Sequence, residues 1–243
     1  MPLAREGWEG GEEGSPESED LRRRNQTIEL LAEGGFVFRV CFSLVAAFLA
    51  ALVLASGAFA VRVHVRVEGK TKTIFGPTAP VLDVAATRLG ATSPNALDAL
   101  ESASALGEFF YHLTVTSFGP YVDQIGRYAA GGTTGWVFKL NGASPPVGAD
   151  QVQLRDSDSV LWYWADFGPS GGPPTLILRR SGRCYSVLTQ DDAGKTSVAN
   201  GAVLHLGVRR LVATRKGRAC IARHGGLLVR ATLAGAVRSV ALP

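Results

Sequence analysis

The chain has 243 residues, which suffices for one large domain or two small ones, and its formal net charge is +4. It contains no paired His or Cys residues at metal-binding spacing and no nucleophile signature. We therefore expect a protein that is not an enzyme and that holds no metal or cofactor. The positive charge is concentrated near the C-terminus, because residues 174–243 contain 12 Lys and Arg but only two acidic residues, Asp191 and Asp192. This segment either binds an acidic polymer or an anionic envelope, or is a solvated face, and we expect no nucleic-acid partner.

The beginning of the chain divides into a polar part and an apolar part. Residues 1–35 are rich in Gly and Glu and poor in β-branched and aromatic residues, which predicts a disordered region. Two explanations for this region stay open. It is either a cytoplasmic tail or the product of a start codon assigned upstream of the true one.

Residues 36–60 are expected to be a signal peptide or a transmembrane helix. They hold an uncharged apolar stretch that ends in Ala58-Phe59-Ala60, the small-x-small pattern of signal-peptidase sites. The stretch is also long enough to cross a bilayer as a helix, so an uncleaved membrane anchor at residues 40–61 is the alternative. In both cases the rest of the chain is extracytoplasmic, either secreted or anchored at the outer face of the cytoplasmic membrane.

Residues 61–167 are predicted to form an α+β domain of the β-grasp type, in which one helix crosses a mixed sheet. The segment Val61–Val67 alternates valines with Arg or His, as in a half-buried strand whose polar side faces solvent. Ser93 is expected to be the N-cap of a helix that has Pro94 in its first turn and runs to about Ser104. The expected strands cover residues 61–67, 71–75, 109–116, 136–140 and 160–165.

Aromatic side chains are concentrated in this domain, since 12 of the 20 in the chain lie between Phe109 and Phe167. A small sheet has only two faces. We therefore expect one set of these rings to pack under the helix and another to form an accessible apolar patch, unless the C-terminal domain covers it. The candidate ligand-binding residues are Trp136, Phe138, Asn141, Trp162, Tyr163 and Trp164.

Four segments of this domain resemble the transcobalamin-type C-terminal domain family. They are Gly135-Trp136-Val137-Phe138-Lys139-Leu140-Asn141-Gly142, Val147-Gly148-Ala149-Asp150, Leu154-Arg155-Asp156-Ser157-Asp158 and Val160-Leu161-Trp162-Tyr163-Trp164. Ser157 stands where the family favours glycine. The resemblance implies a β-domain that helps to bind cobalamin or a related small ligand. In transcobalamin this domain closes over cobalamin held by a helical domain, which this sequence lacks, so we expect at most half of such a site.

A breaker-rich linker at residues 168–174 leads to residues 175–243, which are predicted to form a small Ig-like or transthyretin-like β-sandwich. Segments 191–194, 201–203, 214–219 and 228–232 resemble transthyretin-like, carboxypeptidase-regulatory-like repeats. This resemblance implies a spacer or adhesion unit. Cys184 and Cys220 are expected to form a disulfide if the domain is exported, and to be free buried thiols if it stays in the cytosol.

Together these features predict an exported, non-catalytic binding module of the cell envelope. Its partner is expected to be a small molecule, with cobalamin as one candidate, or another envelope protein. The competing interpretation is a structural or adhesive cell-surface protein, whose domains space or dock other proteins. The aromatic strands favour a ligand, whereas the spacer-like last domain favours adhesion.

Overall fold

The computed structural model describes residues 60–87, 92–117, 119–169, 171–207, 209–213, 216–221 and 225–243. The chain divides into two compact units, residues 1–57 and 58–243, and all described residues belong to the second. The expected disordered region, residues 1–35, and nearly all of the expected signal peptide or transmembrane helix, residues 36–60, lie outside the described residues. Within the part that is described, no helix has the length and apolarity of a membrane span.

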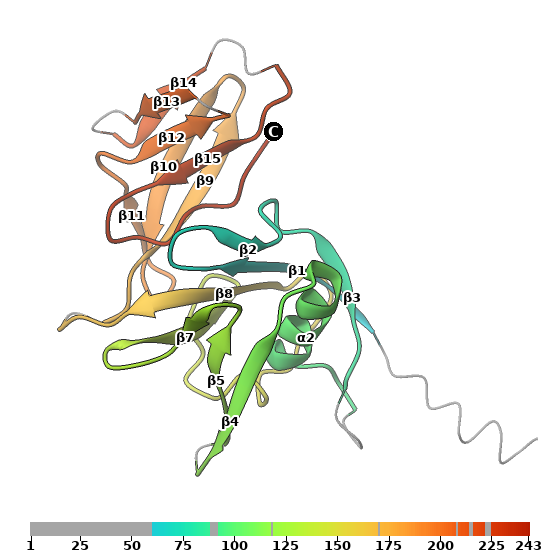
Figure 1. The fold of residues 1–243 in the computed structure, drawn as a ribbon. Helices are drawn as coiled ribbons and strands as arrows, with labels where there is room; N and C mark the ends of the chain where they lie inside the picture. Colours follow the sequence, from blue (N-terminus) through green and yellow to red (C-terminus); the bar gives the residue numbers. More distant parts are fainter. Residues whose placement is uncertain are drawn as a thin grey trace, which may run out of the picture. The chain divides into compact units, whose positions relative to one another are not determined.

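The first half of this unit is built on a five-stranded mixed sheet with one helix packed on it (Figure 1). Its strand order is β2-β1-β8-β7, with β3 also paired to β1, and the two central strands β1 and β8 run parallel. A separate antiparallel sheet, β4-β5-β6, follows the helix. The elements are β1 (Val61–Glu68), β2 (Thr73–Phe75), β3 (Val81–Val84), α2 (Ala96–Gly107), β4 (Tyr111–Thr116), β5 (Gly119–Ile125), β6 (Tyr128–Ala129), β7 (Thr134–Leu140) and β8 (Ser159–Asp166).

Strand β1 has the expected alternation, and Arg62 on its polar side is exposed, but the C-terminal part of that side does not face solvent. Val63, Val65 and Val67 are fully buried in the core that includes helix α2. On the opposite face, Arg66 and Glu68 are only 7% and 1% exposed. The C-terminal half of the unit contacts these two side chains, and the alternation within one strand cannot predict such a partner.

Helix α2 begins two residues later than Pro94, and its N-cap is Asn95 rather than Ser93. Asn95 Oδ1 accepts hydrogen bonds from the backbone N–H groups of Leu97 at 2.9 Å and Asp98 at 3.0 Å. Asp98 Oδ2 accepts the N–H of Asn95 at 2.8 Å, which completes a capping box. The apolar stripe of the helix is buried, as expected; it consists of Ala96, Leu97, Ala99, Leu100 and Ala103.

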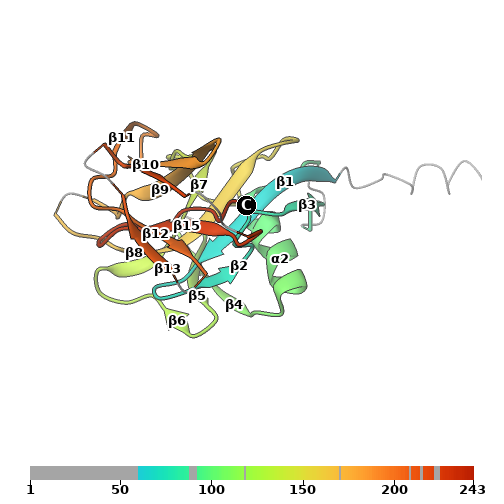
Figure 2. The same ribbon diagram turned by 90° about the horizontal axis from the view of Figure 1, so that it is seen from above.

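The second half of the unit is all β and consists of two sheets (Figures 1 and 2). One has the order β11-β10-β14, with β9 also paired to β10, and the other has the order β13-β12-β15. Tyr185, Val187 and Leu204 are among the residues that form a second core between them, in agreement with the predicted β-sandwich. The strands are β9 (Thr175–Ser181), β10 (Cys184–Gln190), β11 (Thr196–Val198), β12 (Val203–Leu206), β13 (Arg209–Val212), β14 (Arg218–Cys220) and β15 (Val229–Thr232).

Cys184 and Cys220 form the expected disulfide. The two residues lie opposite each other where β10 pairs with β14, and 36 positions separate them in sequence. Closing a loop of this length stabilises the fold by about 4 kcal/mol in the chain-entropy model. Disulfides persist mainly in oxidising compartments, so the bridge points to an extracytoplasmic environment.

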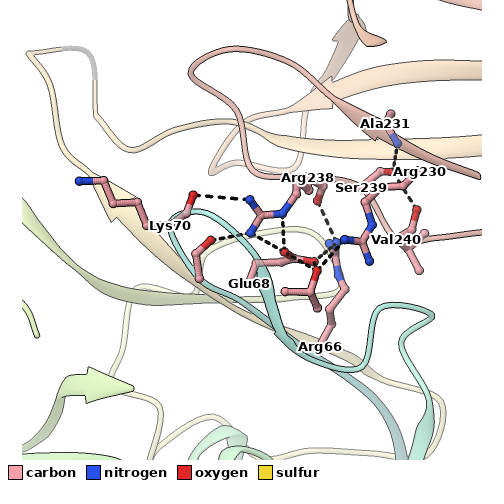
Figure 3. Close-up of polar contacts among 10 residues, drawn as sticks. Arg66, Glu68, Lys70, Arg230, Ala231, Arg238, Ser239 and Val240 are labelled. Carbon is pink, nitrogen blue, oxygen red and sulfur yellow. Dashed lines mark hydrogen bonds and ion pairs between the residues drawn. The ribbon is translucent and has the colours of Figure 1, made fainter. Parts of the chain in front are cut away.

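A buried ionic cluster joins the two halves (Figure 3). The Glu68 side chain has no exposed surface, and its carboxylate accepts hydrogen bonds from Arg66 Nη1 at 3.2 Å and Arg238 Nε at 2.9 Å. Thr73 Oγ1 donates to the same carboxylate, and Arg230 Nη1 donates to that hydroxyl at 2.8 Å. Because Arg230 and Arg238 come from the second half, Glu68 binds the two halves together.

Candidate ligand pocket at the edge of strand β7

The register of β7 and β8 decides which face of the sheet the predicted aromatic residues share. Trp136 lies opposite Trp164, and Phe138 lies opposite Trp162. Residues directly opposite one another in a sheet project from the same face, so all four rings point toward the core under α2. Tyr163 alternates with Trp162 and Trp164 along β8 and projects from the opposite face.

Two of these rings are fixed by hydrogen bonds as well as by packing. The indole N–H of Trp136 donates to the carbonyl oxygen of Tyr128 at 2.8 Å, and that of Trp162 donates to the carbonyl oxygen of Ala96 at 3.2 Å. Both Trp side chains are 2% exposed. A buried indole whose N–H is satisfied is a rigid wall, so these residues can shape a cavity without rearranging.

An apolar pocket of about 310 Å³ lies beside β7, which is an edge strand of the sheet. Four of the six predicted ligand-binding residues line it: Trp136, Phe138, Trp162 and Tyr163. The other walls come from Pro120, Tyr121 and Val122 of β5, from Phe167, and from the loop after β7, which contributes Ser144, Pro145, Gly148 and Ala149. A volume of this size is at the low end of the range for small-molecule sites.

The pocket lining includes one charged side chain, Asp192, which comes from the second half of the unit. Asp192 Oδ1 accepts hydrogen bonds from Ser144 Oγ at 3.1 Å and Tyr163 OH at 3.4 Å, and it lies 3.5 Å from Lys139 Nζ. Among the described residues, no hydrogen bond reaches its second oxygen, Oδ2, and the side chain is 48% exposed. Asp192 therefore adds a partly exposed carboxylate to the lining of the pocket.

Lys139 and Tyr163 hold this carboxylate in place. Lys139 is 1% exposed, and its Nζ donates to the carbonyl oxygens of Gln190 at 3.1 Å and Asp191 at 2.7 Å, which fixes the segment before Asp192. Burial lowers the pKa of Lys139, while the nearby Asp192 acts in the opposite direction and favours the charged form. Burial also raises the pKa of Tyr163, and Asp192 adds to the effect. The Tyr163 hydroxyl therefore keeps its proton and acts as a donor.

Asn141 and Trp164, the other two predicted ligand-binding residues, lie outside this pocket. Asn141 has a φ of 51° in the turn after β7; its amide donates to Asp158 Oδ1 at 2.7 Å, and its Oδ1 accepts the N–H of Ser159 at 2.9 Å. It thus fixes the start of β8. Trp164 packs edge-on against Trp136, with ring centroids 5.6 Å apart, and lines a different cavity.

The acidic turn before β8 is stabilised by its own carboxylates. Asp156 Oδ1 accepts the N–H of Arg62 at 2.8 Å, and Asp158 Oδ2 accepts the N–H of Arg155 at 2.8 Å. These contacts are typical of aspartate in turns. In the part of the chain that the structure describes, no group of three or more His, Cys, Asp or Glu residues is placed to hold a metal ion.

No local pattern in the sequence pointed to Asp192 or to β5 as parts of the site. Asp192 lies in a turn-forming Asp191-Asp192-Ala193-Gly194 segment of the other half, and only tertiary structure brings it to β7. Strand β5 begins with Gly119 and Pro120, which argue against a strand when the sequence is read alone.

Comparison with known proteins gives one family match. A family model described as "Domain of unknown function (DUF4430)" matches residues 93–166, less than half of the chain. The matched segment begins before helix α2 and ends with β8, so it contains the pocket residues of β5, β7 and β8 but neither β1 nor Asp192. A search of curated proteins finds no match to the chain. Over residues 93–166 the protein is similar to DUF4430 domains.

Proposed function

We propose that the protein is an exported, non-catalytic binding module of the cell envelope that holds its ligand in the pocket beside β7. The observation that carries this proposal is the pocket itself, which has mainly apolar walls and a single carboxylate in its lining. Ligand sites typically combine an apolar lining with a few polar groups that orient the ligand. Asp192 favours a ligand with a hydrogen-bond donor or a positive charge near an apolar group.

The match to DUF4430 and the order of the strands support a transcobalamin-like, β-grasp assignment for residues 61–167. The central parallel pair β1 and β8, the antiparallel neighbours β2 and β7 and the single helix agree with that fold. Cobalamin is therefore one candidate ligand. A pocket of about 310 Å³ accommodates only a part of so large a molecule, so a smaller aromatic or aliphatic ligand fits it better.

Export is supported by the Cys184–Cys220 disulfide and by the signal-like sequence at residues 36–60. Intact-mass measurement of the protein recovered from cells distinguishes the two topologies. A chain that begins at Val61 indicates a cleaved signal peptide, and a chain that retains residues 40–60 indicates a membrane anchor. Alkylation of Cys184 and Cys220 in the folded protein without reductant would contradict the disulfide and remove its support for export.

The pocket is tested with the full-length chain in detergent solution, by NMR of its Trp indole N–H groups. Indole and cyanocobalamin serve as the probe ligands. We expect a saturable shift of the Trp136 and Trp162 resonances, because both rings line the pocket, and a smaller shift of Trp164, which lies outside it. Equal shifts of all Trp resonances, or none with either probe, would contradict a ligand site at this position.

The contribution of the carboxylate is tested with tryptamine, which adds a cation to the indole ring. Asp192→Asn is expected to weaken tryptamine binding about tenfold, since it removes one charge-assisted contact, and to leave indole binding nearly unchanged. Asp166→Asn is the matched control, because Asp166 lies at the end of β8 and does not line this pocket. If both variants behave alike, Asp192 does not orient the ligand.

A second candidate function, docking of another envelope protein, is favoured by a specific feature of the same site. Within the part of the chain that the structure describes, no hydrogen bond reaches the outward backbone groups of Trp136 and Phe138 in β7, which line the pocket.

A further inference from the structure

The hydrogen-bond pattern of β7 shows which of its backbone groups point away from β8. Phe167 N–H donates to the Thr133 carbonyl, and Asn141 N–H donates to the Ser159 carbonyl, both at 2.9 Å. In an antiparallel pair, such hydrogen-bonded positions recur at every second residue. The odd-numbered residues of β7 therefore bond to β8, and the N–H and C=O groups of its even-numbered residues point to the free edge.

Both ends of this free edge are closed by local turns. Thr134 exchanges two hydrogen bonds with Gly131, each 3.0 Å long, and Leu140 exchanges two with Ala143, at 2.8 and 3.1 Å. Trp136 and Phe138 remain between these turns. Among the described residues, no hydrogen bond reaches the outward N–H and C=O groups of these two residues.

The unpaired edge lines the pocket, and β5, which lies beside β7, forms no backbone hydrogen bond with it among the described residues. Trp136 and Phe138 line the pocket, and the segment of β5 that lines its opposite wall belongs to a separate sheet. Pro120 in that segment has no N–H group to donate. Backbone polar groups beside an apolar cavity are costly when they remain unpaired, so a ligand that pairs them gains affinity.

We propose that the occupant of this pocket is an extended segment of another protein, which adds to β7 as a further strand and forms backbone hydrogen bonds with Trp136 and Phe138. This inference rests on the proposed function and names the class of partner. Two donor–acceptor pairs that lie two residues apart match the repeat of an extended peptide, about 6.8 Å. Main-chain pairing of this kind is a common mode of peptide recognition.

The two sides of the pocket define the side chains that the partner segment needs. A strand added to β7 sends successive side chains to opposite faces of the sheet. One face has the apolar surface of Phe138 and Val122, and the other has Tyr163 and Asp192. Asp192 is the one charged residue among the described residues that line the pocket. We therefore expect an apolar residue next to a Lys or Arg in the bound segment.

Peptides that bind the full-length chain can be selected from a phage-displayed library of random sequences. The selected peptide is then synthesised with a single N-methyl group at each position in turn, and its affinity for the unaltered protein is measured by fluorescence anisotropy. Strand addition predicts that N-methylation weakens binding at every second residue, by at least about tenfold, and has little effect at the residues between. Uniform tolerance along the peptide would overturn the proposal.

Two substitutions at one position separate the role of the backbone from that of the side chain. Phe138→Ala keeps the outward N–H group, whereas Phe138→Pro removes it without breaking a hydrogen bond to β8. We expect Phe138→Ala to reduce peptide affinity a few fold and Phe138→Pro to reduce it at least tenfold more. Equal affinities for the two variants, with indole resonances as dispersed as those of the unaltered protein, would contradict strand addition. The N-methyl scan decides the question if Phe138→Pro does not fold.

The outcomes for the partner and for the pocket can be told apart. If indole shifts the Trp136 and Trp162 resonances but selection yields no peptide that competes with it, the pocket binds small molecules and strand addition is wrong. If neither indole nor peptides bind, the proposed function fails as well. Sedimentation of the protein alone tests pairing between two β7 edges, and a dimer that Phe138→Pro dissociates would replace the peptide partner with a second copy of the chain.

Discussion

Ser157 has a strained backbone conformation at a position where the sequence already suggested one. Its φ is 70°, in the left-handed region, in the acidic turn before β8. This conformation costs a non-glycine residue about 1–2 kcal/mol. Glycine avoids that cost but loses more backbone entropy on folding, which offsets part of the difference. The family that the sequence motif resembles favours glycine at this position, so Ser157, where the motif differs from that family, also has the strained conformation.

We expect Ser157→Gly to raise the free energy of unfolding by up to about 1 kcal/mol, because it relieves the left-handed conformation. The measurement is urea unfolding followed by Trp fluorescence. Ser159→Gly is the control, since Ser159 lies in β8 and its replacement is expected to lower the same free energy by about 0.5–1 kcal/mol. Destabilisation of similar size by both variants would contradict this explanation.

The candidate site illustrates what residue patterns can and cannot predict. The aromatic strand motifs identified Trp136, Phe138, Trp162 and Tyr163 as candidates, and the structure places these four around one pocket. Asn141 belongs to the same motif, but in the structure it stabilises the turn before β8. Asparagine favours turns, and this tendency explains its place in the motif. Asp192 had no local signal. Its position beside the pocket depends on tertiary contact between the two halves of the unit, which no pattern within either half predicts.

At the scale of elements, helix α2 was predictable in position but not in its N-cap. Ser93 before Pro94 is a common beginning of a helix, yet Asn95 and Asp98 form a reciprocal capping box that has the same three-residue spacing as the usual motif. Strand β5 was missed because Pro120 lies near its beginning. The structure tolerates Pro120 since the strand bonds to β4 and β6 and not to β7.

The N-cap assignment predicts different results for two neighbouring substitutions. Asn95→Ala is expected to lower the free energy of unfolding by about 1–2 kcal/mol, because two buried backbone N–H groups lose their acceptor. Ser93→Ala is expected to change it by less than about 0.5 kcal/mol. Thermal melting followed by circular dichroism measures both. A larger loss for Ser93→Ala would restore Ser93 as the N-cap.

Strand β12 contains a histidine that makes stability depend on pH. Burial lowers the pKa of His205 below its ordinary value of 6.5, and the charges of Arg210 and Arg230 act in the same direction. The unfolded chain therefore binds a proton more readily than the folded one, so stability decreases as the pH falls below 6.5 and stops decreasing below the folded-state pKa.

We expect the urea midpoint of the unaltered protein to fall more between about pH 7.5 and about pH 5 than that of His205→Gln. Gln cannot take up the proton, and its amide can still bond with the Thr232 hydroxyl, which lies 2.8 Å from His205 Nε2. Other titrating groups are common to both proteins and cancel in the comparison. A variant that loses as much stability as the unaltered protein would show that His205 does not titrate in this range.

At the scale of the whole described unit, one buried carboxylate connects the two halves. The Glu68→Ala variant leaves Arg66 and Arg238 without their shared counter-charge. We therefore expect the free energy of unfolding to fall by about 3–5 kcal/mol and the single unfolding transition to separate into two. Differential scanning calorimetry resolves the transitions. Asp83→Ala is the control, because its ion pair with Arg62 is 3.8 Å long and exposed, and we expect a change within about 0.5 kcal/mol. A single unshifted transition for Glu68→Ala would contradict the coupling.

Amide hydrogen exchange along β7 shows whether this strand has an unpaired edge beside the pocket. NMR of the full-length chain without ligand should show slow exchange at Gly135, Val137 and Lys139, whose N–H groups bond to β8. The amides of Trp136 and Phe138 should exchange much faster, and a selected peptide should slow them. Equal protection of all five amides in the absence of ligand would show that the edge of β7 is not open.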